Sequence, residues 1–410
     1  MLRNRPARVL MLVENCSYPR DVRVRREAET LAEAGCEVSV ICPALKGQVR
    51  RERLNGVRVV RYVSPPEARG QLGYVVEYGY SLLAALMLTL RIAMRGGIDV
   101  IHAANPPDLF VVIAALFRPF GVKFIYDQHD LAPDMYRARY SGDHKVAIER
   151  VLRFFERWSY RLADHVVVAN ESYRENAEQR GNLPPHRISI VRNGPDATQL
   201  ALSGESPDRL AEPDVITIAY LGLMGVQDGV CHLIRAVDYL VHGLGKTNCR
   251  FRLIGSGEEQ GRLEALVEEL ELEKVVSFMG FIPDPDYIPH LLSADICVDP
   301  DPYSEYNDRS TMIKIMDYMS CGKAIVAFDL KETRRSAGDA ALYVKPNDEC
   351  EFAKAIAYLM DHPEERIAMG KCGRDRVAHE LSWASSAVNL LRAYEALLPG
   401  AISAGEPLQA

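Results

Sequence analysis

The feature that most constrains the fold is an alternation of short apolar segments with helical segments, which runs twice along the chain. Segments of this kind, separated by helices, are typical of βαβ units and a parallel sheet. The predicted strands of the first run are residues 8–13, 37–42, 57–63, 99–102, 123–126, 165–169 and 188–191. Those of the second run are residues 216–221, 250–254, 275–279, 296–298, 324–328 and 341–344.

A polar segment from Pro195 to Pro213 separates the two runs and shows little apolar periodicity. It carries two further prolines, Pro207 and Pro213, which favour a connection over a regular element. We therefore predict an α/β chain with two Rossmann-like domains. The predicted domains are residues 1–195 and 214–380, joined by a linker at 196–213 and followed by a final helix at 381–399.

Composition excludes several classes of protein. The chain has 410 residues, of which 48% are hydrophobic and 26% charged, as expected of a globular protein with a large core. Its net charge of −7 argues against bulk nucleic-acid binding. The nine cysteines show no CxxC spacing, so we expect neither a metal site nor a disulfide framework, and reduced cytoplasmic thiols instead. The N-terminal apolar run reaches Glu14 too early for a signal peptide.

The segment Ser81–Ala93 is apolar and then meets Arg95. It is shorter than the roughly 20 residues that a bilayer-spanning helix needs. Two interpretations remain open, a core helix of the domain or a helix that contacts the inner face of a membrane. Basic residues nearby, Arg91 and Arg118 among them, would suit anionic lipid.

The strongest functional signal follows the strand at residues 296–298. A polar loop ends in Ser310-Thr311, which we expect to begin a helix. Met312, Ile315, Met316 and Met319 recur at helical spacing and predict a core face.

Ser310, Lys314 and Asp317 share the other face of that helix. Backbone amides and a cation suit phosphates, and a carboxylate suits sugar hydroxyls. A nucleotide-sugar needs all three.

Two glycine-rich turns follow predicted strands of the second run. Gly255 and Gly257 lie between a strand and a helix, where they permit either close approach of a phosphate or a tight turn. Gly222 and Gly225 lie in the turn after the first strand of this run. We expect all four to contact the nucleotide.

Further candidates lie at other predicted strand ends. His129 and Asp130 follow the strand at 123–126, where open parallel sheets bind ligands. We expect His129 to act at the reaction centre, with Asp130 or Asp134 orienting it or binding acceptor hydroxyls. Glu332 follows the strand at 324–328 and either contacts the donor or is an exposed turn residue.

The loop after the first strand holds two arginines and an acidic residue. Arg20 and Arg23 could grip an acceptor phosphate, and Asp21 could cap the following helix.

Several of these motifs occur in an order that resembles the retaining GT-B glycosyltransferases of family four, also called group 1. The matching segments are Arg20-Asp21-Val22-Arg23-Val24, His129-Asp130, Asn193-Gly194, Tyr220-Leu221-Gly222 and Leu253-Ile254-Gly255-Ser256-Gly257, with the segment 294–344. The resemblance implies two Rossmann-like domains facing a cleft. It also implies transfer, with retention, of a sugar from a UDP- or GDP-linked donor to a glycan or lipid-linked hydroxyl, in surface polysaccharide or glycolipid synthesis. The donor is a substrate, and no cofactor or metal is implied.

The resemblance also assigns site residues. Family members carry two glutamates separated by seven residues, the first on the donor sugar and the second on the ribose. Here Asp317 stands at the second position and Arg309 at the first, next to Asp308. The usual basic residues are missing from the turn at 222–229, so Lys314 and Arg309 are the expected cations for the diphosphate. With no convincing carboxylate pair, we expect a front-face reaction in which the leaving diphosphate takes the acceptor's proton.

Two alternatives remain open at this point. One is a nucleotide-sugar epimerase of the same fold, since one fold carries many chemistries. The other is a non-catalytic partner subunit, which the replacement of the first glutamate by Arg309 makes conceivable.

Overall fold

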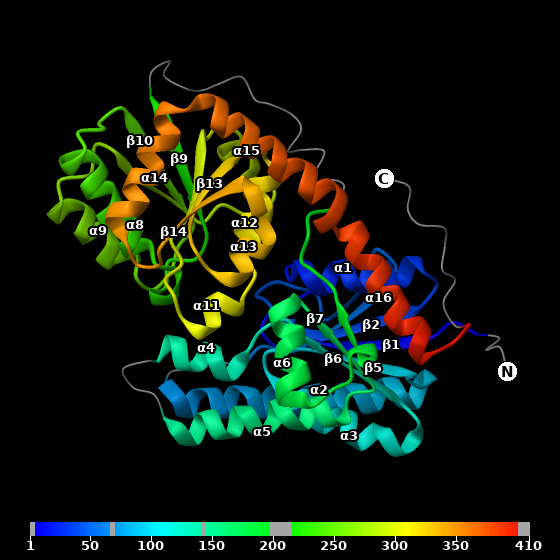
Figure 1. Ribbon diagram of the computed structural model, residues 1–410. Helices are drawn as coiled ribbons and strands as arrows, with labels where there is room; N and C mark the ends of the chain where they lie inside the picture. The colour runs from blue at the N-terminus through cyan, green and yellow to red at the C-terminus, as the bar shows by residue number, and fades with distance from the viewer. Residues whose placement is uncertain (1–4, 66–69, 141–144, 197–214, 401–410) are drawn as a thin grey trace. The chain divides into compact units, whose positions relative to one another are not determined.

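The structure is a computed structural model that describes residues 5–65, 70–140, 145–196 and 215–400 (Figure 1). Residues 197–213 of the predicted linker lie outside the described residues. The chain divides into two compact units. The first comprises residues up to Asn193 together with the segment from Ser386 onward, and the second comprises Gly194–Ser385.

The first unit is built around a mostly parallel sheet. Its strands are β1 (Arg8–Leu12), β2 (Glu37–Ala44), β3 (Arg51–Leu54), β4 (Val57–Val63), β5 (Val100–Ala104), β6 (Lys123–Gln128), β7 (His165–Val168) and β8 (Ile188–Ile190). Its helices are α1 (Val22–Glu33), α2 (Gly70–Gly96), α3 (Val111–Phe117), α4 (Ala132–Arg139), α5 (Val146–Leu162), α6 (Glu171–Gly181) and, from Ser386, α16 (Trp383–Leu397). Among the described residues the strand order is β3-β4-β2-β1-β5-β6-β7-β8.

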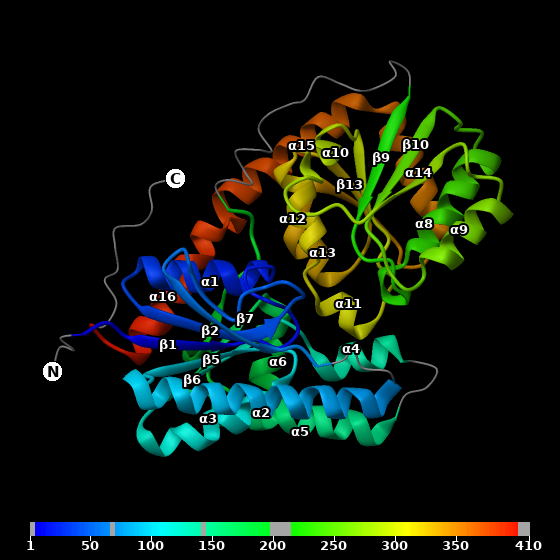
Figure 2. The ribbon, with the colours of Figure 1, turned by 180° about the vertical axis from the view of Figure 1, so that it is seen from behind.

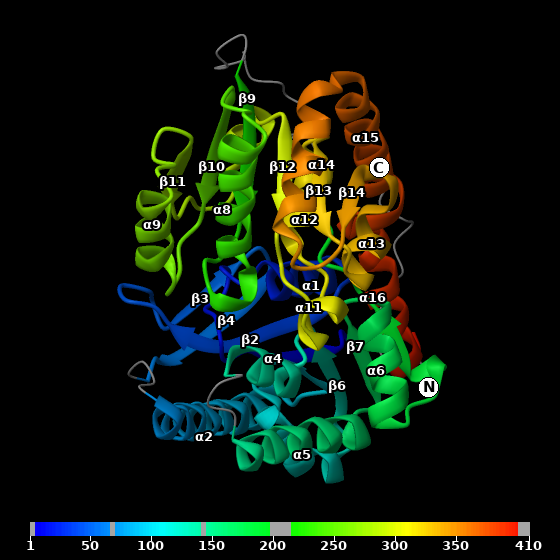
Figure 3. The same cartoon turned by 60° about the vertical axis from the view of Figure 1, so that its left-hand side comes forward.

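The second unit repeats the same plan with a smaller sheet. Its strands are β9 (Ile216–Leu221), β10 (Cys249–Ile254), β11 (Val276–Gly280), β12 (Ile296–Asp299), β13 (Ala324–Phe328) and β14 (Ala341–Val344). Its helices are α8 (Val230–Asp238), α9 (Gln260–Glu269), α10 (Ile288–Leu292), α11 (Glu305–Arg309), α12 (Ile313–Ser320), α13 (Lys331–Ala337), α14 (Glu349–Asp361) and α15 (Pro363–Arg376). The described strands are all parallel, in the order β11-β10-β9-β12-β13-β14 (Figures 2 and 3).

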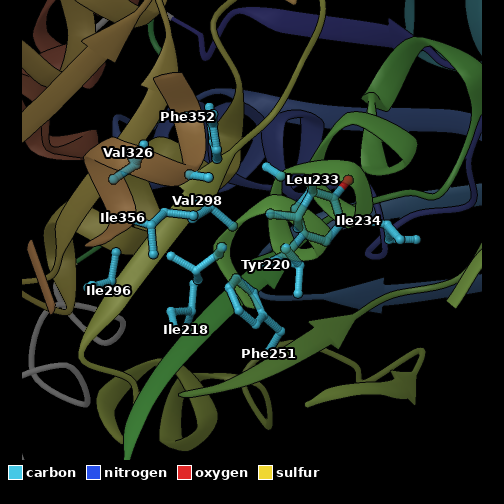
Figure 4. Close-up of a cluster of buried hydrophobic side chains, with 14 of the residues drawn as sticks. Ile218, Tyr220, Leu233, Ile234, Phe251, Ile296, Val298, Val326, Phe352 and Ile356 are labelled. Atoms are coloured by element: carbon cyan, nitrogen blue, oxygen red, sulfur yellow. The ribbon is translucent and has the colours of Figure 1, made fainter. Parts of the chain in front are cut away.

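The core of the second unit lies on both faces of its sheet, because successive strand residues point to opposite sides. Ile218 and Tyr220 of β9 pack toward α8 and α14 with Phe352, in the cluster shown in Figure 4. Ala219, between them, packs on the other face with Ile315 of α12. The buried, nearly continuous apolar strands are those expected of a parallel sheet covered on both faces. The two Rossmann-like α/β domains predicted from the sequence are therefore confirmed.

Candidate active site

In the second unit, the strand order reverses around β9. The chain adds β10 on one side of β9 and later adds β12 on the other side. The loops that follow β9 and β12, residues 222–229 and 300–312, therefore begin at adjacent strand ends and lead away from each other. In open α/β sheets, ligands bind at such a reversal point, outside the carboxyl ends of the strands. Both loops contain residues predicted to bind the nucleotide.

Lys314 lies at this point, but its charge is already paired. Its ammonium lies 3.0 Å from Asp299 Oδ1 and 2.6 Å from Asp301 Oδ1, and 4.9 Å from the centre of the Tyr220 ring. Burial alone would lower the pKa of Lys314, but the charges of Asp299 and Asp301 hold it well above its usual value. Burial and the neighbouring Asp299 raise the pKa of Asp301 well above its usual value. The lysine is therefore a charged, internally neutralised group.

Side chains tie the two loops together. Asp228 Oδ2 accepts a hydrogen bond of 2.9 Å from the amide of Gly225, which shapes the first loop. Asn307 is buried and donates from Nδ2 to the carbonyl oxygens of Gln227 (2.9 Å) and Pro302 (2.8 Å). Asn307 therefore links the loop after β12 to the loop after β9.

The predicted helix start at Ser310-Thr311 is wrong. A short helix, α11, occupies the loop, with Ser304 as its N-cap, and Ser310 is the residue at its C-terminal end. The Ser310 hydroxyl donates to the carbonyl of Tyr306 at 2.8 Å, and α12 begins only at Ile313. Met312 provides no side-chain cap to α12, and the Ile315 amide of the first turn donates to the Met312 carbonyl at 3.1 Å. An anion would therefore be bound by the amides that precede Ile315.

The remaining predicted residues of this unit lie at different depths. Asp317 is buried on α12, and burial with the charge of Asp317 raises the pKa of the neighbouring Tyr287. Asp308 accepts a hydrogen bond from the amide of Lys331 at 2.9 Å. Glu332 is fully buried and pairs with Arg335 at 2.8 Å, so the alternative of an exposed turn residue is wrong.

The glycines are required by the packing of one turn against another. A Cβ at Gly255, whose φ is +135°, would lie 1.8 Å from the carbonyl oxygen of Gly222. A Cβ at Gly257 would lie 2.4 Å from the carbonyl oxygen of Met224. The tight-turn interpretation therefore explains Gly255 and Gly257, and the packed turns fix the shape of the loop at 222–229.

In the first unit, His129 and Asp130 lie in the loop that follows β6. The side chain of Asn105, just after β5, fixes this loop by accepting and donating hydrogen bonds. Its Oδ1 accepts from the amides of His129 (2.9 Å) and Asp130 (3.0 Å), and its Nδ2 donates to the Asp130 carbonyl (2.7 Å). Asn105 is buried, so the position of the histidine is fixed by a neighbouring strand of the sheet.

Asp127, two residues before His129, is the carboxylate that orients the imidazole. Its Oδ2 lies 3.2 Å from His129 Nδ1. Burial lowers the pKa of His129, but the hydrogen bond and the charge of Asp127 outweigh burial and raise it to about 9. His129 is therefore an imidazolium at neutral pH. Asp134, one of the predicted orienting groups, is instead paired with Arg180 at 2.5 Å, so that alternative is wrong.

Arg23 cannot bind an acceptor phosphate as predicted, because it is buried and engaged. Its guanidinium lies 2.6 Å from Asp127 and 3.2 Å from Glu27, and donates to the Val191 carbonyl at 2.7 Å. Glu27, His102 and Asp127 approach closely enough to hold a metal ion, but the guanidinium already supplies the cation there. Asp21 caps α1 as predicted, accepting from the amide of Val24 at 3.0 Å.

Sequence reasoning missed four polar residues of these sites: Asn105, Asp127, Asp299 and Asp301. Each lies at or just after the carboxyl end of a strand, where polar residues break an apolar run. Their position at the carboxyl ends of predicted strands could have identified them as site residues.

Two family models match the chain. The first half, residues 21–194, matches the glycosyl transferase 4-like domain, and residues 215–362 match glycosyl transferases group 1. Together they span both units.

Curated relatives match at low identity over nearly the full length. The 2-deoxystreptamine glucosyltransferase of Streptomyces kanamyceticus is 23% identical over 391 residues, covering 92% of this chain and 98% of the relative. The D-inositol 3-phosphate glycosyltransferase of Corynebacterium efficiens is 26% identical over 404 residues, with 93% and 91% coverage.

Solved structures show the same fold. Sucrose-phosphate synthase from Thermosynechococcus elongatus has a TM-score of 0.77 at 20% identity, covering 95% of this chain and 99% of its own. HepE of Anabaena, in complex with UDP-glucose, has a TM-score of 0.68 at 15% identity, with 95% and 99% coverage. With both units matched by glycosyltransferase models and by these relatives, the chain belongs to the group 1, family four glycosyltransferases and has the GT-B fold.

Proposed function

We propose that the protein transfers a glycosyl group from a nucleoside diphosphate sugar, with UDP as the carrier, to a hydroxyl acceptor with retention of anomeric configuration. The observation that carries the proposal is the polar reversal point of the second unit. There the first turn of α12 carries Lys314, whose ammonium pairs with Asp299 and lies over the ring of Tyr220, just before the loop at 222–229. Backbone N–H groups at a helix start bind phosphates directly.

The charge of Lys314 determines which other groups must bind the diphosphate. Lys314 is already paired with Asp299 and Asp301, so its charge is offset within the protein and the phosphates need further donors. We propose that the amides of α12 and the guanidinium of Arg309 bind the phosphates. In this proposal the ammonium of Lys314 also points toward them. Gly222, Gly225, Gly255 and Gly257 shape the loops that admit the ligand.

Asp317 is the proposed ribose ligand. It lies one turn along α12 from Lys314 and is buried, so a hydrogen bond from a ribose hydroxyl to its carboxylate would be shielded from water. Hydrogen bonds to a charged group contribute about 1.5–3 kcal/mol each. Asp308 and Glu332 are the proposed carboxylates near the donor sugar, in place of the family's first glutamate.

His129 is the proposed catalytic group. A positioned imidazolium stabilises negative charge that develops as the sugar–phosphate bond breaks. We propose a front-face transfer in which the leaving diphosphate accepts the proton of the acceptor hydroxyl. Asp130 is the proposed ligand of an acceptor hydroxyl, and no cofactor enters the scheme.

The choice of UDP draws on HepE, which was solved with UDP-glucose. The two curated relatives are named as glycosyltransferases of 2-deoxystreptamine and of inositol 3-phosphate. They support a hydroxyl acceptor, whereas a glycan or lipid-linked acceptor, in surface polysaccharide or glycolipid synthesis in the cytoplasm, is proposed from the resemblance to the family alone.

A panel of UDP- and GDP-linked sugars tests the proposal, with released nucleoside diphosphate and the anomeric configuration of the product measured together. We expect release of UDP from one donor and an axial-to-axial or equatorial-to-equatorial transfer. An isomerised nucleotide-sugar without released UDP would identify an epimerase. Absence of both products, with UDP still bound, would identify a non-catalytic subunit.

A matched pair of variants gives the control for donor binding. Asp317→Asn should weaken UDP binding at least tenfold, in line with the loss of a charge-assisted hydrogen bond. Asp329→Asn, at an exposed carboxylate paired with Arg334, should not change it.

A further inference from the structure

An exposed apolar stripe runs along α2. Val76, Tyr80, Leu83, Met87, Leu90 and Met94 follow one another at alternating spacings of four and three residues, which places them on one face of the helix. Leu83, Met87 and Met94 are 61%, 66% and 81% exposed. Large apolar side chains this exposed, in one continuous row, mark a contact surface.

The opposite face of α2 belongs to the domain. Ser81, Ala85 and Thr89 are completely buried, and the Ser81 hydroxyl donates to Glu14 at 3.0 Å. The segment Gly73–Gly96 is long and apolar enough to cross a membrane, yet 22% of its most apolar window is packed inside the unit. A helix held in this way can lie on a bilayer without crossing it. The structure confirms the core role for one face of the helix only.

Helix α5 carries exposed apolar side chains of its own. It lies beside α2 beneath the first sheet in all three views of the ribbon (Figures 1, 2 and 3). Val146, Val151 and Phe154 on α5 are 53%, 54% and 59% exposed. A groove of about 750 Å³ runs along the helix, with Phe154 and Trp158 among its lining residues.

Arginines accompany the apolar side chains. Arg150, Arg157 and Arg161 line the groove on α5 and are exposed. Within the ranges of the chain that the structure describes, no carboxylate lies within ion-pair distance of these three arginines. Arg91 and Arg95 add two exposed cations at the end of α2. This surface is therefore cationic on a chain whose net charge is −7.

We propose that the face formed by α2 and α5 docks the protein on a bilayer that contains anionic lipids, with the apolar stripe in the interface and the arginines on the headgroups. Interfacial helices combine these features, an apolar face and flanking Lys or Arg residues. A second copy of the chain fits less well, because it would bring like-charged arginines together at the edge of the apolar stripe.

Co-sedimentation with vesicles tests the proposal on the full chain. Wild type should pellet with vesicles that mix phosphatidylglycerol and phosphatidylcholine, pellet less in high salt, and pellet weakly with phosphatidylcholine alone. Each arginine near an anionic surface strengthens binding about fivefold. The triple variant Arg150→Gln, Arg157→Gln, Arg161→Gln should therefore lose about a hundredfold in affinity.

A second variant probes the apolar part. Leu83→Gln with Met87→Gln should weaken binding at least tenfold, and both side chains are exposed enough for the fold to survive. The matched controls are Ile367→Gln, 73% exposed on α15 of the second unit, and Arg262→Gln on α9, whose side chain is 81% exposed. Both controls should bind vesicles as wild type does.

Trp158 supplies a direct reading of the contact. The chain has two tryptophans, so a Trp383→Phe variant leaves Trp158 as the sole reporter. Its emission should shift to the blue with anionic vesicles. No pelleting of wild type, or pelleting unchanged in both variants, would overturn the proposal. So would a dimer in sedimentation velocity that Met87→Gln dissociates while vesicles remain unbound.

Discussion

At the scale of single residues, the first question is what His129 does in the reaction. It is anchored through Asn105 and Asp127 and carries a charge at neutral pH. A group that acts on charge developing in the transition state lowers kcat when it is removed, with little change in ground-state binding. We expect His129→Ala to reduce transfer by roughly 10²–10⁴-fold, as for other positioned polar groups, while UDP affinity stays within about twofold.

Calorimetry with UDP, beside a transfer assay, measures both parts of this prediction. His165→Ala is a poor control because His165 packs in the core, whereas His186→Ala, in an exposed turn, is suitable. Near-normal transfer by His129→Ala would place the reaction centre elsewhere.

Asp127 should control the charge of His129. Without the carboxylate, burial and the nearby Arg23 remain, and both lower the pKa of an imidazole. We expect Asp127→Asn to move the pKa of His129 from about 9 to below its ordinary value of about 6.5. Titration of the His129 ring protons by NMR measures the shift. Asp130→Asn serves as the comparison, since Asp130 contributes less to this pKa, and equal shifts in the two variants would refute the assignment.

At the scale of secondary-structure elements, the sequence predicted buried strands best. The bounds of β4, β9, β13 and β14 agree with the prediction. The last three are largely apolar runs between turn residues, whereas β4 carries Arg58 and Arg61 among its valines. The edge strand β3 was missed, since its four residues, Arg51–Leu54, are mostly charged. Asn55 and Gly56, both with positive φ, form the turn between β3 and β4, and this Asn-Gly pair was the signal for a hairpin.

The candidate site was only partly predictable, for a physical reason. Ser304 and Ser310 are equally good N-caps by residue type, but Ser304 caps the short helix α11 and Ser310 ends it. Asn307 of α11 is held by long-range contacts, such as its bond to the Gln227 carbonyl, which no local pattern shows. The partners of Lys314 and Arg23 are set by the same long-range packing. Arg23 and Asp127 are 104 residues apart, and no local pattern links them. The strand ends could be predicted from the sequence, but the ion-pair partners depend on the tertiary structure.

The segment from β12 to α12 supports a prediction about Lys314. Removing one partner of a buried ion pair costs about 3–5 kcal/mol, because the other charge stays buried and unpaired. We expect Lys314→Ala to destabilise the protein by about that amount, and the triple variant Lys314→Ala, Asp299→Asn, Asp301→Asn to recover most of it. Chemical denaturation measures both free energies of unfolding.

The same triple variant separates structure from binding. If Lys314 contacts the diphosphate, the refolded triple variant should bind UDP at least tenfold more weakly than wild type, yet bind uridine equally well. Equal affinities of wild type and triple variant for UDP would leave the lysine with a structural role only.

At the scale of the whole molecule, buried titratable groups make stability depend on pH. Burial raises the pKa of Glu14, Glu27 and Asp108 to about 7, and Asp127 holds that of His129 at about 9 against the effect of burial. Each pKa is higher in the folded than in the unfolded chain, where about 3.9–6.5 is expected. Such groups stabilise the fold fully below their unfolded pKa, and this contribution is lost as the pH rises through the folded pKa.

Groups whose pKa is lower in the folded chain change the stability over a different pH range. Burial lowers the pKa of His165 to about 4, so its contribution is complete once the pH exceeds about 6.5. Burial would raise the pKa of Asp127, but the charge of Arg23 holds it well below its usual value. The contribution of Asp127 to stability is therefore complete at a lower pH than that of His165. Between about pH 6.5 and 9, the groups with raised pKa values therefore set the direction of the change in stability.

We therefore expect the free energy of unfolding to fall on the order of 3 kcal/mol from about pH 6.5 to about pH 9. Urea denaturation across this range measures the slope. Glu14→Gln removes one titrating group, so its slope between pH 6.5 and about 8 should be shallower than that of wild type. Glu33→Gln, at the exposed end of α1, should leave the slope unchanged. A free energy that is flat or rises with pH would show that these carboxyls are ionised in the folded protein at neutral pH.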